Sequence, residues 1–266
     1  MERIQAECNL IVLPSVDSTN TYAKTHFHEL EDGTVVTAIE QFAGRGRLGR
    51  KWSATTPDAA LTSSAIFKKV ALPFHAGAIL GLAGLELIRE YLPGTFVFFK
   101  WPNDIYVREK KLAGILSEGV LSGGKLSGVV SGIGININQT AEAFGDIDAP
   151  ATSLKIISGK NFFLKKMRLE LAEKIKKYYI IYQSHSETVL ELWRAENRLI
   201  GEKLVLKCPD GTEKYGVFSA IGDGGEMIIH SPDGDFFVFD CGDVKIDKSL
   251  INFNLLENKH NKQDNL

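Results

Sequence analysis

Cysteine is scarce in this chain, and net charge is almost absent. The 266 residues include three cysteines, and the formal net charge is -2. Cys8, Cys208 and Cys241 are odd in number, far apart and without metal-ligand spacing, so we expect free thiols in a reducing compartment. The near-neutral balance gives no overall electrostatic reason to expect binding to nucleic acid.

A long apolar run is also missing. The longest, at about residues 76–88, contains Glu86 and is too short to span a bilayer. The first ten residues lack the apolar centre of a signal peptide. We therefore expect a soluble cytoplasmic protein with no membrane partner. With 44% hydrophobic residues, the chain can bury a large core as one domain, or as a large domain with a small one.

Residues 1–200 alternate between strand-like and helix-like patterns, which predicts an α+β fold. The helix patterns cover 18–30, 73–91, 161–182 and 186–198. Ser18 suits an N-cap, and Pro73 suits the first turn of the second helix. The strand patterns cover 9–14, 34–39, 61–67, 96–100, 104–107, 112–118 and 127–138.

The pattern changes near Gly201. Five short apolar runs follow, separated by turns such as Gly222-Asp223-Gly224-Gly225, and this spacing predicts a small β-barrel over 201–250. No helix pattern follows that glycine turn, so we interpret it as a hairpin turn and not as a phosphate loop. Residues 251–266 are rich in Asn and Lys, and we predict a disordered tail.

The most informative segment is GRGRLGRKW at residues 44–52, where three glycines alternate with four cations. Glycine lets the backbone turn tightly and expose N–H groups, and arginine offers a rigid fork of donors that suits phosphate. The segment predicts an anion-binding loop, and a nucleotide phosphate is the first candidate for the anion. A solvated basic surface loop is the alternative.

Together with that loop, four further segments resemble the biotin protein ligases. In chain order the matching segments are VDSTN at 16–20, Gln41 with the loop at 44–52, KWPND at 100–104, KLAGIL at 111–116 and GIGININ at 132–138. The resemblance implies a class II synthetase-like catalytic domain, with a mixed or antiparallel sheet flanked by helices. It also implies that the C-terminal barrel is the SH3-like appendage of this family.

The resemblance implies a reaction in two steps. Biotin and ATP with Mg²⁺ form biotinyl-5′-AMP and pyrophosphate, and the acyl group then passes to one lysine of a biotin carboxyl carrier domain, as in acetyl-CoA carboxylase. Such a reaction needs no protein nucleophile, because positioning and charge stabilisation lower the barrier. No Ser–His–Asp or Cys–His set is evident in the sequence, which fits this chemistry.

By the resemblance, four charged residues carry the catalysis. Arg45 and Arg47 grip the phosphates, while Lys111 contacts the biotin carboxylate and the adenylate phosphate. Asp104 holds Mg²⁺ or orients the incoming lysine. An Asx-type turn is the alternative role for Asp104. A lysine in a turn is ordinarily exposed to solvent and has no further role. The match to the family motif nevertheless assigns the catalytic role to Lys111 and not to its neighbour Lys110.

The remaining assignments concern the two ligands. The biotin residues implied are Ser18, Thr19, Asn20, Gln41, Gly44, Arg45, Lys111 and Gly114. The ATP and adenylate residues implied are Arg47, Arg50, Trp52, Lys100, Asn103, Gly132, Gly134 and Asn136. In GIGININ, alternation puts three isoleucines on one strand face and leaves the glycines on the other as a ligand floor.

Three other functions stay open. A lipoate or octanoate transferase shares the architecture, but the arginine loop and KWPND argue against it. A biotin-sensing repressor needs a DNA-binding domain, and the fifteen residues before Val16 leave no room for one, so we expect no binding to DNA. A noncatalytic adaptor leaves the basic loop unexplained. The sequence leaves a homodimer open and does not identify the acceptor protein.

Overall fold

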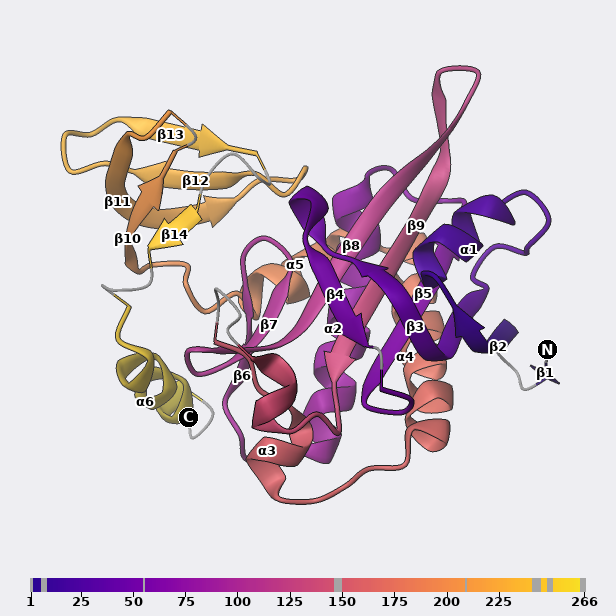
Figure 1. Cartoon of the computed structure of the whole chain (residues 1–266). Coiled ribbons are helices and arrows are strands. Elements are labelled where there is room, and N and C mark those ends of the chain that lie inside the picture. The colour runs from indigo at the N-terminus through magenta and orange to yellow at the C-terminus, as the bar shows by residue number, and fades with distance from the viewer. Residues whose placement is uncertain are drawn as a thin grey trace.

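The computed structural model in Figure 1 describes residues 2–5, 9–54, 56–145, 150–208, 210–240, 245–247 and 251–263, so Cys8 and Cys241 lie outside it. A mixed nine-stranded sheet forms its centre, with the order β1-β2-β3-β5-β9-β8-β7-β6 and with β4 paired to β3. Only β2 and β3 pair in parallel among these strands. The bounds are β1 Glu2–Gln5, β2 Asn9–Val16, β3 Val35–Arg45, β4 Lys51–Ala54, β5 Ala60–Phe67, β6 Val97–Lys100, β7 Asp104–Val107, β8 Lys110–Ser122 and β9 Lys125–Asn136.

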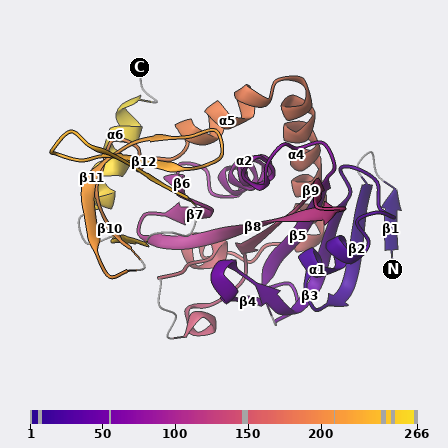
Figure 2. The same cartoon turned by 90° about the horizontal axis from the view of Figure 1, so that it is seen from above.

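Helices cover both faces of this sheet. The helices α2, α4 and α5 lie over one face, and α1 lies over the other, as Figure 2 shows from above. The bounds are α1 Thr19–Thr25, α2 Pro73–Tyr91, α3 Leu154–Ser158, α4 Leu164–Ser184 and α5 Ser186–Ala195, with short 3-10 turns at Arg47–Gly49 and Ala141–Phe144. No helix of the described residues is long and apolar enough to cross a membrane.

The main core lies between the sheet and α2. This helix begins at Pro73, as predicted, and most of its residues from His75 to Ile88 are buried. Ile133 and Ile135 of β9 lie in this core with at most 3% exposure. Their alternation therefore leaves the glycines of β9 on the opposite face, which confirms the prediction of a strand with one apolar face.

A second, antiparallel sheet follows in the order β13-β12-β11-β10-β14. Its strands are β10 Lys203–Lys207, β11 Glu213–Ile221, β12 Met227–His230, β13 Phe236–Phe239 and β14 Lys245–Asp247. Between the described strands, pairing runs as an open path from β13 to β14, so the sheet is confirmed but a closed barrel is not found there. The turn predicted at Cys241 lies outside the described residues.

The predicted disordered tail is wrong for residues 253–263, which form α6 (Phe253–Gln263). Asn252 accepts a hydrogen bond from the backbone N–H of Leu255 at the start of this helix. Leu256 is 5% exposed and belongs to the main core, and the ring of Phe253 lies 6.3 Å from that of Phe98. The packing of these two apolar side chains stabilises the helix despite the polar composition of the segment. Residues 264–266 are not described.

The basic loop is more regular than the sequence predicts. The strand β3 continues to Arg45, and β4 pairs back with it, so the loop is the end of a β-hairpin. The backbone N–H of Gly46 donates to the carbonyl of Arg50, with 2.7 Å between the two atoms. Conversely, α1 ends at Thr25 rather than near residue 30, with His26 as its C-cap.

Candidate functional site

A buried polar cluster lies at the start of α1, where Ser18 caps the helix by accepting from Thr21 N–H. Gln41 Oε1 accepts from the backbone N–H of Thr19 at 2.9 Å, and the Ser64 hydroxyl lies 2.7 Å from Thr19 Oγ1. All these residues except Thr21 are at most 5% exposed. The cluster therefore offers fixed donors and acceptors to a small polar ligand.

Glu118 of β8 connects this cluster to the basic loop. Its carboxylate accepts from Asn20 Nδ2 at 2.9 Å and pairs with Lys24 at 2.9 Å and with Arg45 at 3.3 Å. Burial alone would raise the pKa of Glu118, but the hydrogen bonds from Lys24 and Asn20 and the charge of Arg45 outweigh it and lower the pKa. Glu118 therefore stays ionised and holds Arg45 beside α1.

A glycine floor adjoins the cluster on the same sheet face. Gly114 of β8 pairs with Gly134 of β9, and Leu116 pairs with Gly132. A Cβ on Gly134 would collide with the indole ring of Trp52, and a Cβ on Gly132 would collide with the amide of Asn20. The missing side chains thus let flat groups lie directly on the sheet.

Trp52 and Lys111 meet above this floor. The Lys111 Nζ atom lies 5.7 Å from the centre of the Trp52 ring and 2.6 Å from Oδ1 of Asp104. The Nε1 atom of Trp52 is buried and has no hydrogen-bond acceptor among the described residues. Because buried polar atoms are rarely left unpaired, this N–H is suited to an acceptor on a ligand.

The arginines of the basic loop point to different anchors. Arg45 reaches Glu118 and Thr21, whereas Arg47 reaches Oδ1 of Asn103 at 3.4 Å. Arg50 is exposed. The hairpin therefore spans the site from α1 to the β6–β7 turn and keeps guanidinium groups on both sides of the glycine floor.

Two of the predicted adenylate residues are engaged elsewhere. The Asn136 Nδ2 atom donates to the Thr152 carbonyl at 3.0 Å, and its Oδ1 accepts from Gln139 at 3.1 Å, so a ligand could use only the remaining donor and lone pair. Lys100 lies over the ring of Tyr106, with 5.5 Å from Nζ to the ring centre.

The donors around Asp104 do not form a metal cage. Its carboxylate already faces Lys111, and no group of three His, Cys, Asp or Glu side chains that could hold a metal occurs in the described part of the chain. Mg²⁺ usually binds through one or two carboxylates together with substrate phosphates and water. Asp104 thus fits Mg²⁺ only as a single ligand to an ion that a nucleotide brings, and its metal role stays a prediction.

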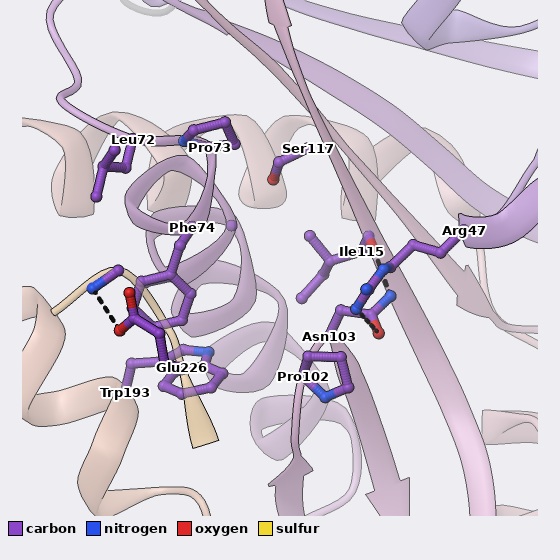
Figure 3. Close-up of a pocket in the computed structure, with 13 residues that line it drawn as sticks. Arg47, Leu72, Pro73, Phe74, Pro102, Asn103, Ile115, Ser117, Trp193 and Glu226 are labelled. Atoms are coloured by element: carbon purple, nitrogen blue, oxygen red, sulfur yellow. Dashed lines mark hydrogen bonds between the residues drawn. The ribbon is translucent and has the colours of Figure 1, made fainter. Parts of the chain in front are cut away.

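A cavity of about 430 Å³ opens beside the site on the α2 side of β8. Figure 3 shows Arg47 and Asn103 on one side of it, and Phe74, Trp193 and Glu226 on the other. Ile115, Ser117 and Pro102 complete much of the wall between them. The cavity is thus shared between the large sheet, the helices and the C-terminal sheet.

Sequence reasoning missed three polar residues of the site, Ser64, Glu118 and Gln139. Each contacts a predicted site residue. Ser64 forms a hydrogen bond with Thr19, Glu118 forms a salt bridge with Arg45, and Gln139 forms a hydrogen bond with Asn136. Glu118 stands two residues after KLAGIL, so the strand alternation could have placed it on the glycine face with Gly114 and Leu116.

Fold and site together define an α+β ligand-binding protein with an arginine hairpin over a glycine floor. A model of the biotin/lipoate A/B protein ligase family matches residues 12–136. Over 235 residues, 85% of this chain and 70% of the relative, the sequence is 31% identical to the bifunctional ligase/repressor BirA of Bacillus spizizenii. The chain therefore belongs to the biotin/lipoate A/B protein ligase family.

Further matches extend the similarity to the whole fold. The chain is 31% identical to a biotin–[acetyl-CoA-carboxylase] ligase of Mycobacterium tuberculosis over 219 residues, which is 80% of this chain and 79% of that protein. The solved biotin protein ligase from Aquifex aeolicus in complex with biotin and ATP matches with a TM-score of 0.73 and 28% identity. That match covers 90% of this chain and 99% of the other.

Proposed function

We propose that this chain is a biotin–carrier-protein ligase that forms biotinyl-5′-AMP from biotin and ATP and transfers the biotinyl group to a carrier lysine. The observation that carries the proposal is the arrangement of Lys111 and Trp52 over Gly114 and Gly134, where a cation and an indole N–H without an acceptor among the described residues lie directly against the glycines of the sheet. The Mycobacterium tuberculosis relative is named as a biotin–[acetyl-CoA-carboxylase] ligase and the Aquifex aeolicus structure contains biotin and ATP, which supports the same acid here.

The polar cluster suits the ureido ring of biotin. That ring has N–H donors and a carbonyl acceptor at fixed angles, and Ser18, Thr19 and Gln41 provide matching groups from rigid positions. Asn20 and Gly44 lie beside them, with Gly44 close to the Gln41 amide. The acyl chain of biotin would then run over Gly132 and Gly114 towards Lys111.

In the first step, a carboxylate oxygen of biotin attacks the α-phosphorus of ATP. A P–O bond forms, the bond to the β-phosphate breaks, and pyrophosphate leaves. Lys111 neutralises charge on the reacting oxygens, and Asp104 orients its ammonium. Arg47 and Arg50 bind the phosphates from the hairpin. Mg²⁺, when bound to the nucleotide, offsets the charge of the departing pyrophosphate.

In the second step, the neutral ε-amine of the carrier lysine attacks the acyl carbon of biotinyl-AMP. A C–N bond forms, the C–O bond to phosphate breaks, AMP leaves with the electron pair, and one proton leaves the nitrogen. No side chain of the enzyme becomes acylated. Positioning of the two substrates lowers the barrier, because the reacting atoms are held in place before the bond forms.

The test is transfer to a biotin carboxyl carrier domain. With ATP, Mg²⁺ and biotin, we expect mass spectrometry to detect one biotinyl group on one lysine of the carrier, and none without ATP. A carrier with that lysine replaced by arginine is the matched control. An unmodified wild-type carrier, in the presence of folded enzyme, would contradict the proposal.

A further inference from the structure

Two amide side chains continue the ligand face of β9 beyond the indole of Trp52. This indole lies across the glycine floor, with its Nε1 end against Gly134 of β9 and its benzene ring against Gly114 of β8. Asn136 is the next residue of β9 on the same face, about 7 Å further along the strand. In the proposed function Lys111 stands at the reacting carboxylate and phosphate. A nucleotide base that stacks on Trp52 therefore turns its polar edge towards Asn136.

The orientation of the Asn136 amide is fixed from two sides. Its Nδ2 atom donates to the Thr152 carbonyl at 3.0 Å, and a carbonyl can only accept. Its Oδ1 atom accepts from Nε2 of Gln139 at 3.1 Å. If the amide turned over, its oxygen would face the Thr152 carbonyl and its nitrogen would face the amino group of Gln139. Both hydrogen bonds would then be lost.

The two partners of Asn136 are themselves held in place. The backbone N–H of Thr152 donates to the carbonyl of Lys111 at 2.9 Å, which ties this segment to the strand of the catalytic lysine. The Ser153 hydroxyl donates to the backbone carbonyl of Gln139 at 2.6 Å. Thr152, Ser153 and Gln139 are at most 8% exposed. The Asn136 amide therefore sits between two buried and fixed groups.

Packing alone does not explain a glutamine at position 139. Because its Nε2 atom faces Asn136, its Oε1 atom points elsewhere, and that oxygen is buried with no hydrogen-bond donor in the described part of the chain. An apolar side chain of similar size would avoid the penalty of a buried, unpaired acceptor. What glutamine provides and an apolar residue cannot is the donor to Oδ1 of Asn136.

An amide held in one orientation distinguishes two classes of purine. Adenine carries an amino donor at C6 and an acceptor at N1, whereas hypoxanthine and guanine carry a carbonyl acceptor at C6 and a donor at N1. An amide that is free to turn over can pair with either class, because its donor and acceptor exchange places. The fixed Asn136 amide has one lone pair left for the amino group of adenine and one N–H left for a ring nitrogen, the pairing that suits adenine.

We propose that Gln139 is a specificity-determining residue that restricts the nucleotide to 6-aminopurines by holding the Asn136 amide in one orientation; this rests on the proposed function. Gln139 acts through Asn136 and is a positioning residue, with no part in making or breaking bonds. A change at Gln139 should therefore alter which nucleotide binds, while the turnover rate at saturating ATP stays the same.

Gln139→Met tests this role, because methionine is of similar size and has no donor. ATP is compared with inosine triphosphate, which differs from it only in the C6 carbonyl and the N1–H. Pyrophosphate release with saturating biotin gives kcat/KM for each nucleotide. We expect the ratio of kcat/KM for ATP to that for inosine triphosphate to fall roughly 2-fold to 12-fold, the equivalent of one hydrogen bond, with kcat for ATP unchanged. The exposed Gln183→Met on α4 is the matched control and should keep the wild-type ratio.

Gln139→Glu is the second variant and decides the question should the methionine variant not fold. An ionised carboxylate can only accept, so it attracts Nδ2 of Asn136 and favours the reversed amide. The ratio should fall further in this variant than in Gln139→Met. A wild-type ratio in a folded Gln139 variant would overturn the inference, and so would equal use of both nucleotides by the wild-type enzyme. Absence of biotinyl-AMP from ATP with the wild-type enzyme is a different result, since it would contradict the proposed function itself.

Discussion

The ammonium of Lys111 lies 2.6 Å from the carboxylate of Asp104, and both side chains lie mostly out of solvent. The pairing connects two motifs, KWPND and KLAGIL, through neighbouring strands β7 and β8. It orients a cation over Gly114 while keeping it close to the face of Trp52. The two residues therefore act together. Replacing Lys111 should lower both activity and stability, whereas replacing an exposed lysine should change neither.

For Lys111→Ala, we expect the rate of biotinyl-AMP formation to fall by a factor of about 10²–10³, the typical effect of removing one stabilising donor from a transition state. The unpaired Asp104 should also lower the free energy of unfolding by about 1–3 kcal/mol. Pyrophosphate release and thermal unfolding measure the two effects. The exposed neighbour Lys110→Ala is the control, and equal turnover of the two variants would remove Lys111 from the mechanism.

Gly134→Ala tests the glycine floor. The added methyl group occupies space that the Trp52 ring now fills, so the ring must move away from the sheet. Stacking of a base on an aromatic ring contributes about 1–3 kcal/mol, so we expect the KM for ATP to rise by roughly 5-fold to 150-fold. Gly119→Ala on the same hairpin meets only a leucine side chain and is the control. An unchanged KM for ATP would show that this floor does not position the nucleotide.

Because of Glu118, the free energy of unfolding should depend on pH in the acid range. Its pKa is lowered in the folded protein from an ordinary value of 4.5, so its contribution to the free energy of unfolding is full above pH 4.5 and is lost as the pH falls through the folded pKa. Glu118→Gln should therefore be less stable than the wild type at pH 6, and the difference should shrink in more acidic buffer.

Denaturant titrations of both proteins from pH 6 down to about pH 3 measure this difference. The exposed Glu191→Gln is the matched control and should follow the wild type at every pH. A Glu118→Gln penalty that is constant over the whole range would show that the side chain contributes through shape and not through charge.

The basic hairpin should become protected when ligands bind. Leu48 and Arg50 at its end are exposed, and the loop closes on itself with few backbone hydrogen bonds. Trypsin can cut after its arginines, and an ordered loop over biotin and ATP should be cut several times more slowly. Mass spectrometry of early fragments localises the cuts. Cleavage at the same rate with and without biotin would argue against ordering of the loop.

The sequence predicts those parts of the molecule that depend on local pattern. Pro73 marks the start of α2, the isoleucines after Gly132 mark the buried face of β9, and Ser18 marks the cap of α1. These features depend on neighbours within a few residues, so spacing alone reveals them.

Contacts between distant segments could not be predicted in this way. Arg45 and Glu118 are 73 residues apart in the chain, and His75 bonds a turn 148 residues away. The prediction of a disordered tail was wrong for a related reason. The composition of this segment is polar, but Leu256 packs into a core formed by the rest of the chain. Tertiary packing determines such features, and the composition of a short segment carries no information about its packing against distant segments.

The most direct test of the account is the identity of the adenylate. The enzyme is incubated with ATP, Mg²⁺ and equal concentrations of biotin, lipoate and octanoate, and the products are analysed by mass spectrometry. We predict biotinyl-AMP as the only acyl-adenylate, formed together with pyrophosphate. Lipoyl-AMP or octanoyl-AMP instead, or no adenylate from folded protein, would contradict the assignment of this site to biotin.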